Sequence, residues 1–138
     1  MEAIIELLHS GDPQNVDLAF TMGAEAANKE EFEEYIAPFE RMFQIAGEDV
    51  NPELKALRDI FKVNLLDLSF CDFEELPGCL LELNQLEKLI LEGNELSGLP
   101  RAISKMPNLN YLCLIDNNIT ALTQFKIEDW LPECDLEW

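Results

Sequence analysis

Basic residues are scarce in this sequence. Nine Lys and Arg stand against 28 Asp and Glu, which gives a formal net charge of −19 at pH 7, and the acidic excess is spread over both halves of the chain. Such a field repels the phosphates of nucleic acids and the anionic headgroups of membranes. The charge therefore argues against nucleic-acid and membrane partners and is compatible with a basic protein partner. High solubility is the simpler explanation of the same charge.

Long apolar stretches and cysteine pairs are also lacking. No segment approaches the roughly 20 apolar residues that span a bilayer, and the residues from Met1 to Leu8 lack the positive start of a signal peptide. The four cysteines, Cys71, Cys79, Cys113 and Cys134, show no CxxC spacing. We therefore expect a cytoplasmic protein with reduced thiols.

Groups that could carry chemistry are equally few. His9 is the single histidine, next to an expected helix end, and the cysteines lack the local pair that structural zinc requires. The run Glu30–Glu34 reads as a solvated helix face rather than a calcium loop. No glycine-rich phosphate loop, HExxH or GxSxG motif is present. The sequence predicts no enzyme, no cofactor and no metal site.

A 23-residue repeat, in contrast, is clear. Three segments begin at Val63, Leu86 and Leu109, and the first two carry apolar residues at offsets 0, 3, 5, 10, 13, 17 and 20 with proline at offset 14. The third segment keeps offsets 0, 3, 5, 10 and 13. Offset 8 is occupied by Cys71, Asn94 and Asn117. The chain is therefore expected to build stacked units with one shared core.

The spacing within a unit predicts its structure. Offsets 3 and 5 follow the strand period, so each unit should place two side chains of a short strand in the core. Offsets 17 and 20 follow the helical period, so the chain should return through a helical or 3₁₀ turn. Asparagine at offset 8 can bond backbone groups of neighbouring units where the chain leaves the strand.

The second unit, Leu86-Glu-Lys-Leu89-Ile-Leu91-Glu-Gly-Asn94-Glu-Leu96-Ser-Gly-Leu99-Pro100, matches the pattern LxxLxLxxNxLxxLP. It resembles the leucine-rich-repeat family, in the form of short bacterial arrays of cytosolic type. The resemblance covers Val63 to Leu122, 60 of the 138 residues. It implies an α/β solenoid, a short right-handed horseshoe segment with a parallel sheet. It also implies an interaction scaffold rather than an enzyme.

Both ends of such an array need caps. We expect a helical N-terminal cap over residues 1–50 and the array over 51–138, with units near 63–85, 86–108 and 109–131. At the C-terminal end, Thr123 should N-cap a helix that Pro132 ends. The core side of this helix is expected to carry Phe125, Ile127, Trp130 and Leu131. A final strand should then bury Cys134, Leu136 and Trp138 on one side.

The first 62 residues carry the signals of several helices. Glu2 to His9 form the first, and Asp12-Pro13 opens a second that runs to Ala26. Asn28 opens a third, which Pro38 kinks or splits and Gly47 ends. Asn51-Pro52 should open a last helix that forms the back half of a degenerate first unit, with Leu54, Leu57, Ile60 and Phe61 on its core side. No Pro/Gly/Ser linker intervenes, so one continuous core is expected.

Strand residues that face away from the core should form a concave surface. It is predicted to bind a protein partner through Leu65, Asp67, Lys88, Ile90, Glu92, Tyr111, Cys113 and Ile115. Exposed apolar surface on a soluble protein marks an interface, and Tyr111 and Ile90 would be anchors. Three alternatives stay open. The N-terminal helices cover this surface, or a second copy does, in which case the protein is a weak homodimer rather than a monomer, or the surface has no binding role.

Overall fold

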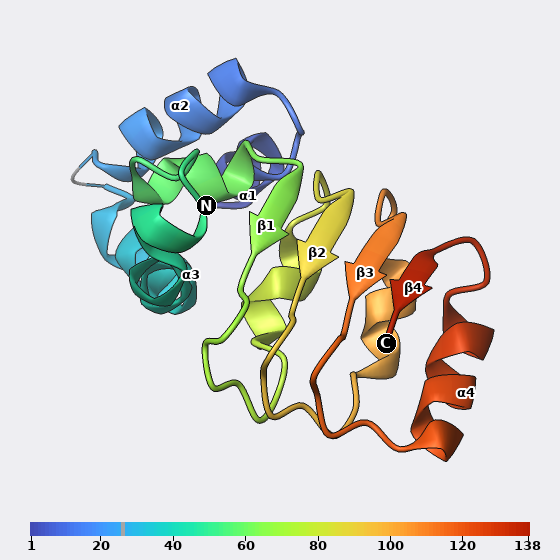
Figure 1. Ribbon diagram of the computed structural model, residues 1–138. Coiled ribbons are helices and arrows are strands. Elements are labelled where there is room, and N and C mark those ends of the chain that lie inside the picture. The colour runs from blue at the N-terminus through green and yellow to red at the C-terminus, as the bar shows by residue number, and fades with distance from the viewer. Residues whose placement is uncertain (26) are drawn as a thin grey trace.

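The computed structural model describes residues 1–25 and 27–138, so the expected helical end at Ala26 lies outside the described residues. Three helices come first: α1 (Glu2–Leu8), α2 (Pro13–Gly23) and α3 (Lys29–Val50). They lead into a four-stranded parallel sheet whose strands lie in chain order, β1-β2-β3-β4 (Figure 1). The protein is thus a mixed helix and parallel-sheet structure.

The strands are short and aligned unit by unit. They are β1 (Leu65–Asp67), β2 (Lys88–Ile90), β3 (Tyr111–Cys113) and β4 (Asp135–Glu137). Leu65 pairs with Lys88, Lys88 with Tyr111, and Tyr111 with Asp135. The first two steps are 23 residues long, as the repeat predicts, and the step to β4 is 24.

Behind the sheet, the chain returns through short helical turns (Figure 1). These are the 3₁₀ helices η1 (Leu57–Phe61), η2 (Gly78–Glu82) and η3 (Arg101–Lys105), followed by the α-helix α4 (Ala121–Trp130). Between the two layers, Leu66, Leu89 and Leu112 are fully buried. The strand and 3₁₀ periods read from the offsets are therefore confirmed for the first two units.

The offset-8 asparagines bond successive units together. Asn94, 4% exposed, accepts hydrogen bonds from the backbone N–H groups of Cys71 (3.1 Å) and Phe73 (3.0 Å). It donates to the carbonyls of Leu68 and Leu91, both at 2.9 Å. One unit on, Asn117 donates to the carbonyls of Leu91 and Leu114 and accepts from the Leu96 N–H, so the predicted asparagine ladder is confirmed.

Immediately before each ladder position, the backbone takes a left-handed turn. Phe70, Gly93 and Asp116 share offset 7 and have φ values of 55°, 65° and 54°. Only Gly93 adopts this conformation without steric strain. The turn is therefore a property of the repeat, and the first and third units accept a strained residue in it.

The N-terminal helices continue the same core. Asp12 caps α2 as predicted, because its carboxylate accepts a 2.8 Å bond from the Gln14 N–H. The aromatic ring of Phe61 in η1 lies 4.8 Å from that of Phe39 in α3 and 6.0 Å from that of Phe20 in α2. One hydrophobic cluster runs from Ile4 to Leu131. The expected continuous core is present.

The third helix is longer than expected. Helical backbone continues through Pro38, so proline does not split α3, and the interruption falls at Gly47, whose φ is 48°. The helix resumes to Val50. Asn51 then ends it rather than opening another: its N–H bonds the Gly47 carbonyl, and its buried side chain donates to the Leu65 carbonyl at 3.3 Å. The expected helix from Asn51-Pro52 is replaced by a turn and η1.

The C-terminal helix begins earlier in the chain than expected. Thr120, not Thr123, N-caps α4, because its hydroxyl accepts a 3.3 Å bond from the Thr123 N–H. The helix therefore turns Leu122 and Phe125 to solvent, with 68% and 70% of their surfaces exposed. Ile127 and Leu131 are buried as expected. The final strand exists as β4, and its core side carries the partly buried Cys134, Leu136 and Trp138.

Candidate partner-binding face

The sheet has one buried face and one outward face, which we call the open face. It carries the side chains that alternate with the core leucines: Leu65, Asp67, Ser69, Lys88, Ile90, Glu92, Tyr111, Cys113 and Ile115. Leu65 and Lys88 are exposed, and most of the others are half-buried. Cys113 is 3% exposed and offers almost no surface, so it acts as an apolar filler among its neighbours. All eight residues predicted from the sequence thus lie on one face.

The N-terminal helices do not cover the open face. They lie beyond the β1 edge of the sheet, and within the described parts of the chain no helix crosses the front of the strands (Figure 1). Helices α2 and α3 pack instead against η1, and α3 also packs against η2, on the opposite side. Within residues 1–25 and 27–138, the protein's own helices therefore leave the open face uncovered.

The open face also includes two acidic residues that the sequence did not assign to it. Strand β4 aligns Asp135 with Tyr111 and Glu137 with Cys113, and both side chains are exposed. The alternation of apolar and acidic residues at the C-terminus indicates a strand. Its register with β3 could not be predicted from the repeat, because the step is 24 residues rather than 23. The Tyr111 hydroxyl donates a 2.8 Å bond to Glu137, which raises the pKa of Tyr111 to about 12.

Carboxylates surround the centre of the open face. Burial raises the pKa of the Cys113 thiol, and the nearby carboxylates of Glu137 on β4 and of Glu92, two residues beyond β2, raise it further. On β1, Asp67 accepts bonds from the Ser69 N–H and hydroxyl at 2.9 and 2.6 Å. Lys88 carries the single positive charge among the open-face residues named above.

Phe70 extends this surface at the ends of the strands. It is 68% exposed, and a Cβ added to Gly93 would overlap its ring, so the ring lies against the backbone of the next unit. The sequence places Phe70 at offset 7 of the first unit, but its contact with Gly93 depends on the left-handed turn, which the pattern of apolar residues does not reveal.

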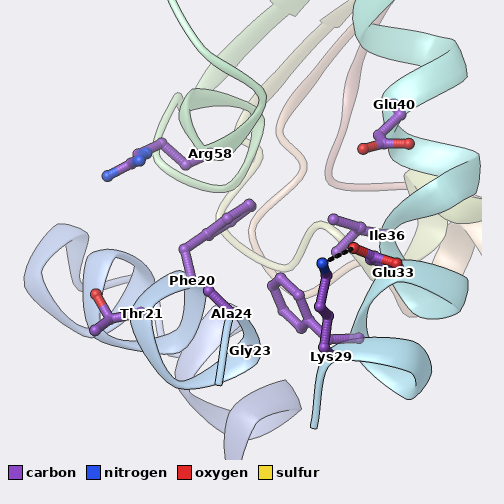
Figure 2. A pocket seen from close by; sticks show the side chains of 10 residues that line it. Phe20, Thr21, Gly23, Ala24, Lys29, Glu33, Ile36, Glu40 and Arg58 are labelled. Atoms are coloured by element: carbon purple, nitrogen blue, oxygen red, sulfur yellow. Dashed lines mark ion pairs between the residues drawn. The ribbon is translucent and has the colours of Figure 1, made fainter. Parts of the chain in front are cut away.

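A separate hollow of about 570 Å³ lies between α2, α3 and η1 (Figure 2). The rings of Phe20 and Phe32, 5.3 Å apart and nearly perpendicular, form part of its wall. Lys29 is paired with Glu33 at 3.7 Å, and Arg58 with Asp17 at 3.3 Å. Because both cations already have carboxylate partners, this hollow is a weaker candidate for ligand binding than the open face.

Chemical sites are not apparent in the described residues. All four cysteines are free. Among residues 1–25 and 27–138, no group of three or more His, Cys, Asp or Glu side chains is arranged to hold a metal ion. In the same part of the chain, no helix has the length and apolar character needed to cross a membrane.

Comparisons with known proteins give limited overlap. No protein-family model matches the chain, and no curated protein matches it. Among solved structures, the chain is similar to a leucine-rich-repeat protein of Leptospira interrogans, with 31% sequence identity and a TM-score of 0.47. The match covers 49% of this chain and 17% of that protein.

Proposed function

We propose that the protein is an interaction module that holds a segment of a partner protein on its open face. The observation that carries this proposal is the outward placement of Leu65, Ile90 and Ile115 on a sheet face that the molecule's own helices leave uncovered. Alternating strands need apolar residues on the core side only. Polar residues would therefore have sufficed at these three positions.

Tyr111 is suited to be the central anchor of such an interface. Its ring lies between Lys88 and Asp135 in the same row, and the bond to Glu137 fixes its hydroxyl. A side chain held in place before binding loses little rotamer freedom when the partner arrives. Interface hot spots, where truncation to alanine costs about 2 kcal/mol or more of binding free energy, are enriched in tyrosine.

A photo-crosslinking amino acid tests the proposal directly. In place of Tyr111 in the full-length chain, an aromatic crosslinker such as p-azidophenylalanine keeps the ring of the proposed anchor, and it should form a discrete crosslinked product in the native lysate. Placed at Ala102, exposed on η3 behind the sheet, it should not form that product. The Ile90→Ser substitution in the Tyr111-labelled chain should remove the product. Equal products from both positions, or a product indifferent to Ile90→Ser, would contradict the proposal.

A second copy of the chain is disfavoured as the occupant. Two open faces in contact would bring Asp67, Glu92, Asp135 and Glu137 of each copy together, and like charges across an interface are repulsive. The expected state at micromolar concentration is a monomer, measured by light scattering at moderate salt. A dimer that Ile90→Ser dissociates would replace the partner-protein proposal with self-association.

A further inference from the structure

The apolar residues of the open face form a diagonal. Leu65 stands in the first row on β1, Ile90 in the second row on β2, and Ile115 in the third row beyond β3. Backbone hydrogen bonds between neighbouring units continue into this third row. The Phe70 N–H donates to the Glu92 carbonyl, and the Gly93 N–H donates to the Ile115 carbonyl. Strand spacing and residue rise make each diagonal step about 8 Å, so the stripe is about 16 Å long.

Carboxylates border both sides of this diagonal stripe. Asp67 and Glu92 lie on one side, each two residues further along its strand than the neighbouring stripe residue. Asp135 and Glu137 of β4 lie on the other side, beyond Tyr111 and Cys113. Lys88, between Leu65 and Tyr111 in the first row, is a basic residue on that same side. The face as a whole therefore carries four carboxylates and one amine around an apolar centre.

We propose that the occupant of the open face is a cationic amphipathic protein segment. Its apolar side chains would lie along Leu65, Ile90 and Ile115, and its Lys or Arg side chains would reach the carboxylates on either side. This inference rests on the proposed function and specifies the partner's chemistry. The stripe's length corresponds to about three turns of a helix, a size at which an amphipathic helix has one continuous apolar side.

Charge complementarity selects this occupant. A neutral apolar segment would partly desolvate four carboxylates without giving them a cationic partner, and an acidic segment would meet like charge on both sides. A cationic segment pairs them instead. The overall charge of −19 would add long-range attraction to the same partner, so a test must separate the open face from the general acidic field.

The test uses the full-length chain and a synthetic leucine/lysine peptide of about three helical turns, with binding followed by fluorescence anisotropy. One variant is Asp67→Asn with Glu92→Gln, on the open face. Its matched control is Glu30→Gln with Glu31→Gln, in the exposed first turn of α3. Both variants raise the net charge by the same two units. Two further peptides serve as controls: one with serine in place of leucine, and one with glutamate in place of lysine.

We expect the open-face variant to weaken binding of the leucine/lysine peptide about ten-fold and the α3 variant less than about two-fold. The serine and glutamate peptides should bind far more weakly to the unaltered protein. Equal weakening by the two variants would overturn the inference, because the general field alone would then hold the peptide. Unchanged binding in the open-face variant would overturn it as well.

The crosslinking assay, repeated with the open-face variants, separates this inference from the proposed function. If Ile90→Ser removes the crosslinked product at Tyr111 while Asp67→Asn with Glu92→Gln leaves it unchanged, the open face holds a partner that is not cationic. The inference then fails and the proposed function stands. If neither variant affects the product, both fail.

Discussion

The ring of Phe70 lies against the backbone of Gly93, so the turn of one repeat unit supports the exposed aromatic residue of the unit before it. Gly93 has a φ of 65°, and a Cβ there would overlap the ring. Two independent reasons therefore require glycine at this position: the backbone conformation and the approach of Phe70.

Gly93→Ala should lower the free energy of unfolding by about 1–3 kcal/mol, because alanine is strained at positive φ and displaces the ring. Gly98→Ala is the matched control, since a Cβ there would meet Thr123 at an ordinary 3.6 Å. Its effect should stay within about 1 kcal/mol. Urea unfolding measures both. Equal losses would show that neither the turn nor the ring is decisive.

Asn94→Ala should be among the most destabilising polar substitutions. It removes the partner of two backbone N–H groups and two carbonyls at the junction of two units, and we expect a loss of about 2–4 kcal/mol. The exposed Asn118 offers the control, with an expected loss below about 1 kcal/mol for Asn118→Ala. The ladder's role would be refuted if the two variants unfolded at the same urea concentration.

Leu99 and Leu122 occupy the same repeat offset in different environments. Leu99 is 8% exposed and Leu122 is 68% exposed. Leu99→Ala should therefore lower the free energy of unfolding by about 2–4 kcal/mol, and Leu122→Ala by less than about 1 kcal/mol. Calorimetry or urea unfolding distinguishes them. Comparable losses would indicate that α4 buries Leu122 after all.

Mild acid should destabilise the junction between the helices and the first unit. Glu82 only accepts, so the Tyr35 hydroxyl donates to it at 2.5 Å and accepts from His9 Nε2 at 2.8 Å. This leaves His9 Nδ1 without a proton, buried and unpaired beside the ring of Phe61. Burial lowers the pKa of His9 below 6.5, although the Glu82 carboxylate partly opposes the shift.

Because the folded pKa of His9 is depressed, the unfolded chain binds the proton more readily. The contribution of neutral His9 is fully present above pH 6.5 and is lost as the pH falls from there through the folded pKa. The difference in unfolding free energy between the unaltered protein and His9→Gln should therefore shrink as the pH is lowered from neutral through the folded pKa of His9. Urea unfolding at several pH values gives this difference. A constant difference would show that the pKa of His9 is the same in the folded and unfolded states.

The repeat itself could be predicted from the sequence because each core leucine serves a local period. Leu66 and Leu68 are two residues apart and both fully buried, as strand alternation requires. Leu122 could not be placed in the same way. In the first two units, proline follows the leucine at this offset, as in Leu99-Pro100, and keeps that leucine out of helical backbone. Thr123 lacks this constraint, so α4 begins at Ala121.

Asn51 shows the other limit of local patterns. Asn followed by Pro is a common helix start, yet the Asn51 side chain donates to the Leu65 carbonyl, 14 residues later in the chain. That bond holds Asn51 at the junction of α3 and the sheet. A tertiary contact of this kind overrides the capping preference. The place of Asp135 and Glu137 on the open face is non-local as well, because it depends on the register of β4 with β3.

The alternation along each strand separates two sets of residues that selection can act on independently. Leucines on the buried side maintain the stacking of units, whereas Leu65, Ile90 and Ile115 on the other side contribute little to that stacking. Substitutions among the outward residues could therefore accumulate without loss of the fold. A scaffold of this kind could change its specificity by exchanging the exposed side chains of the open face, while the frame that presents them stays constant.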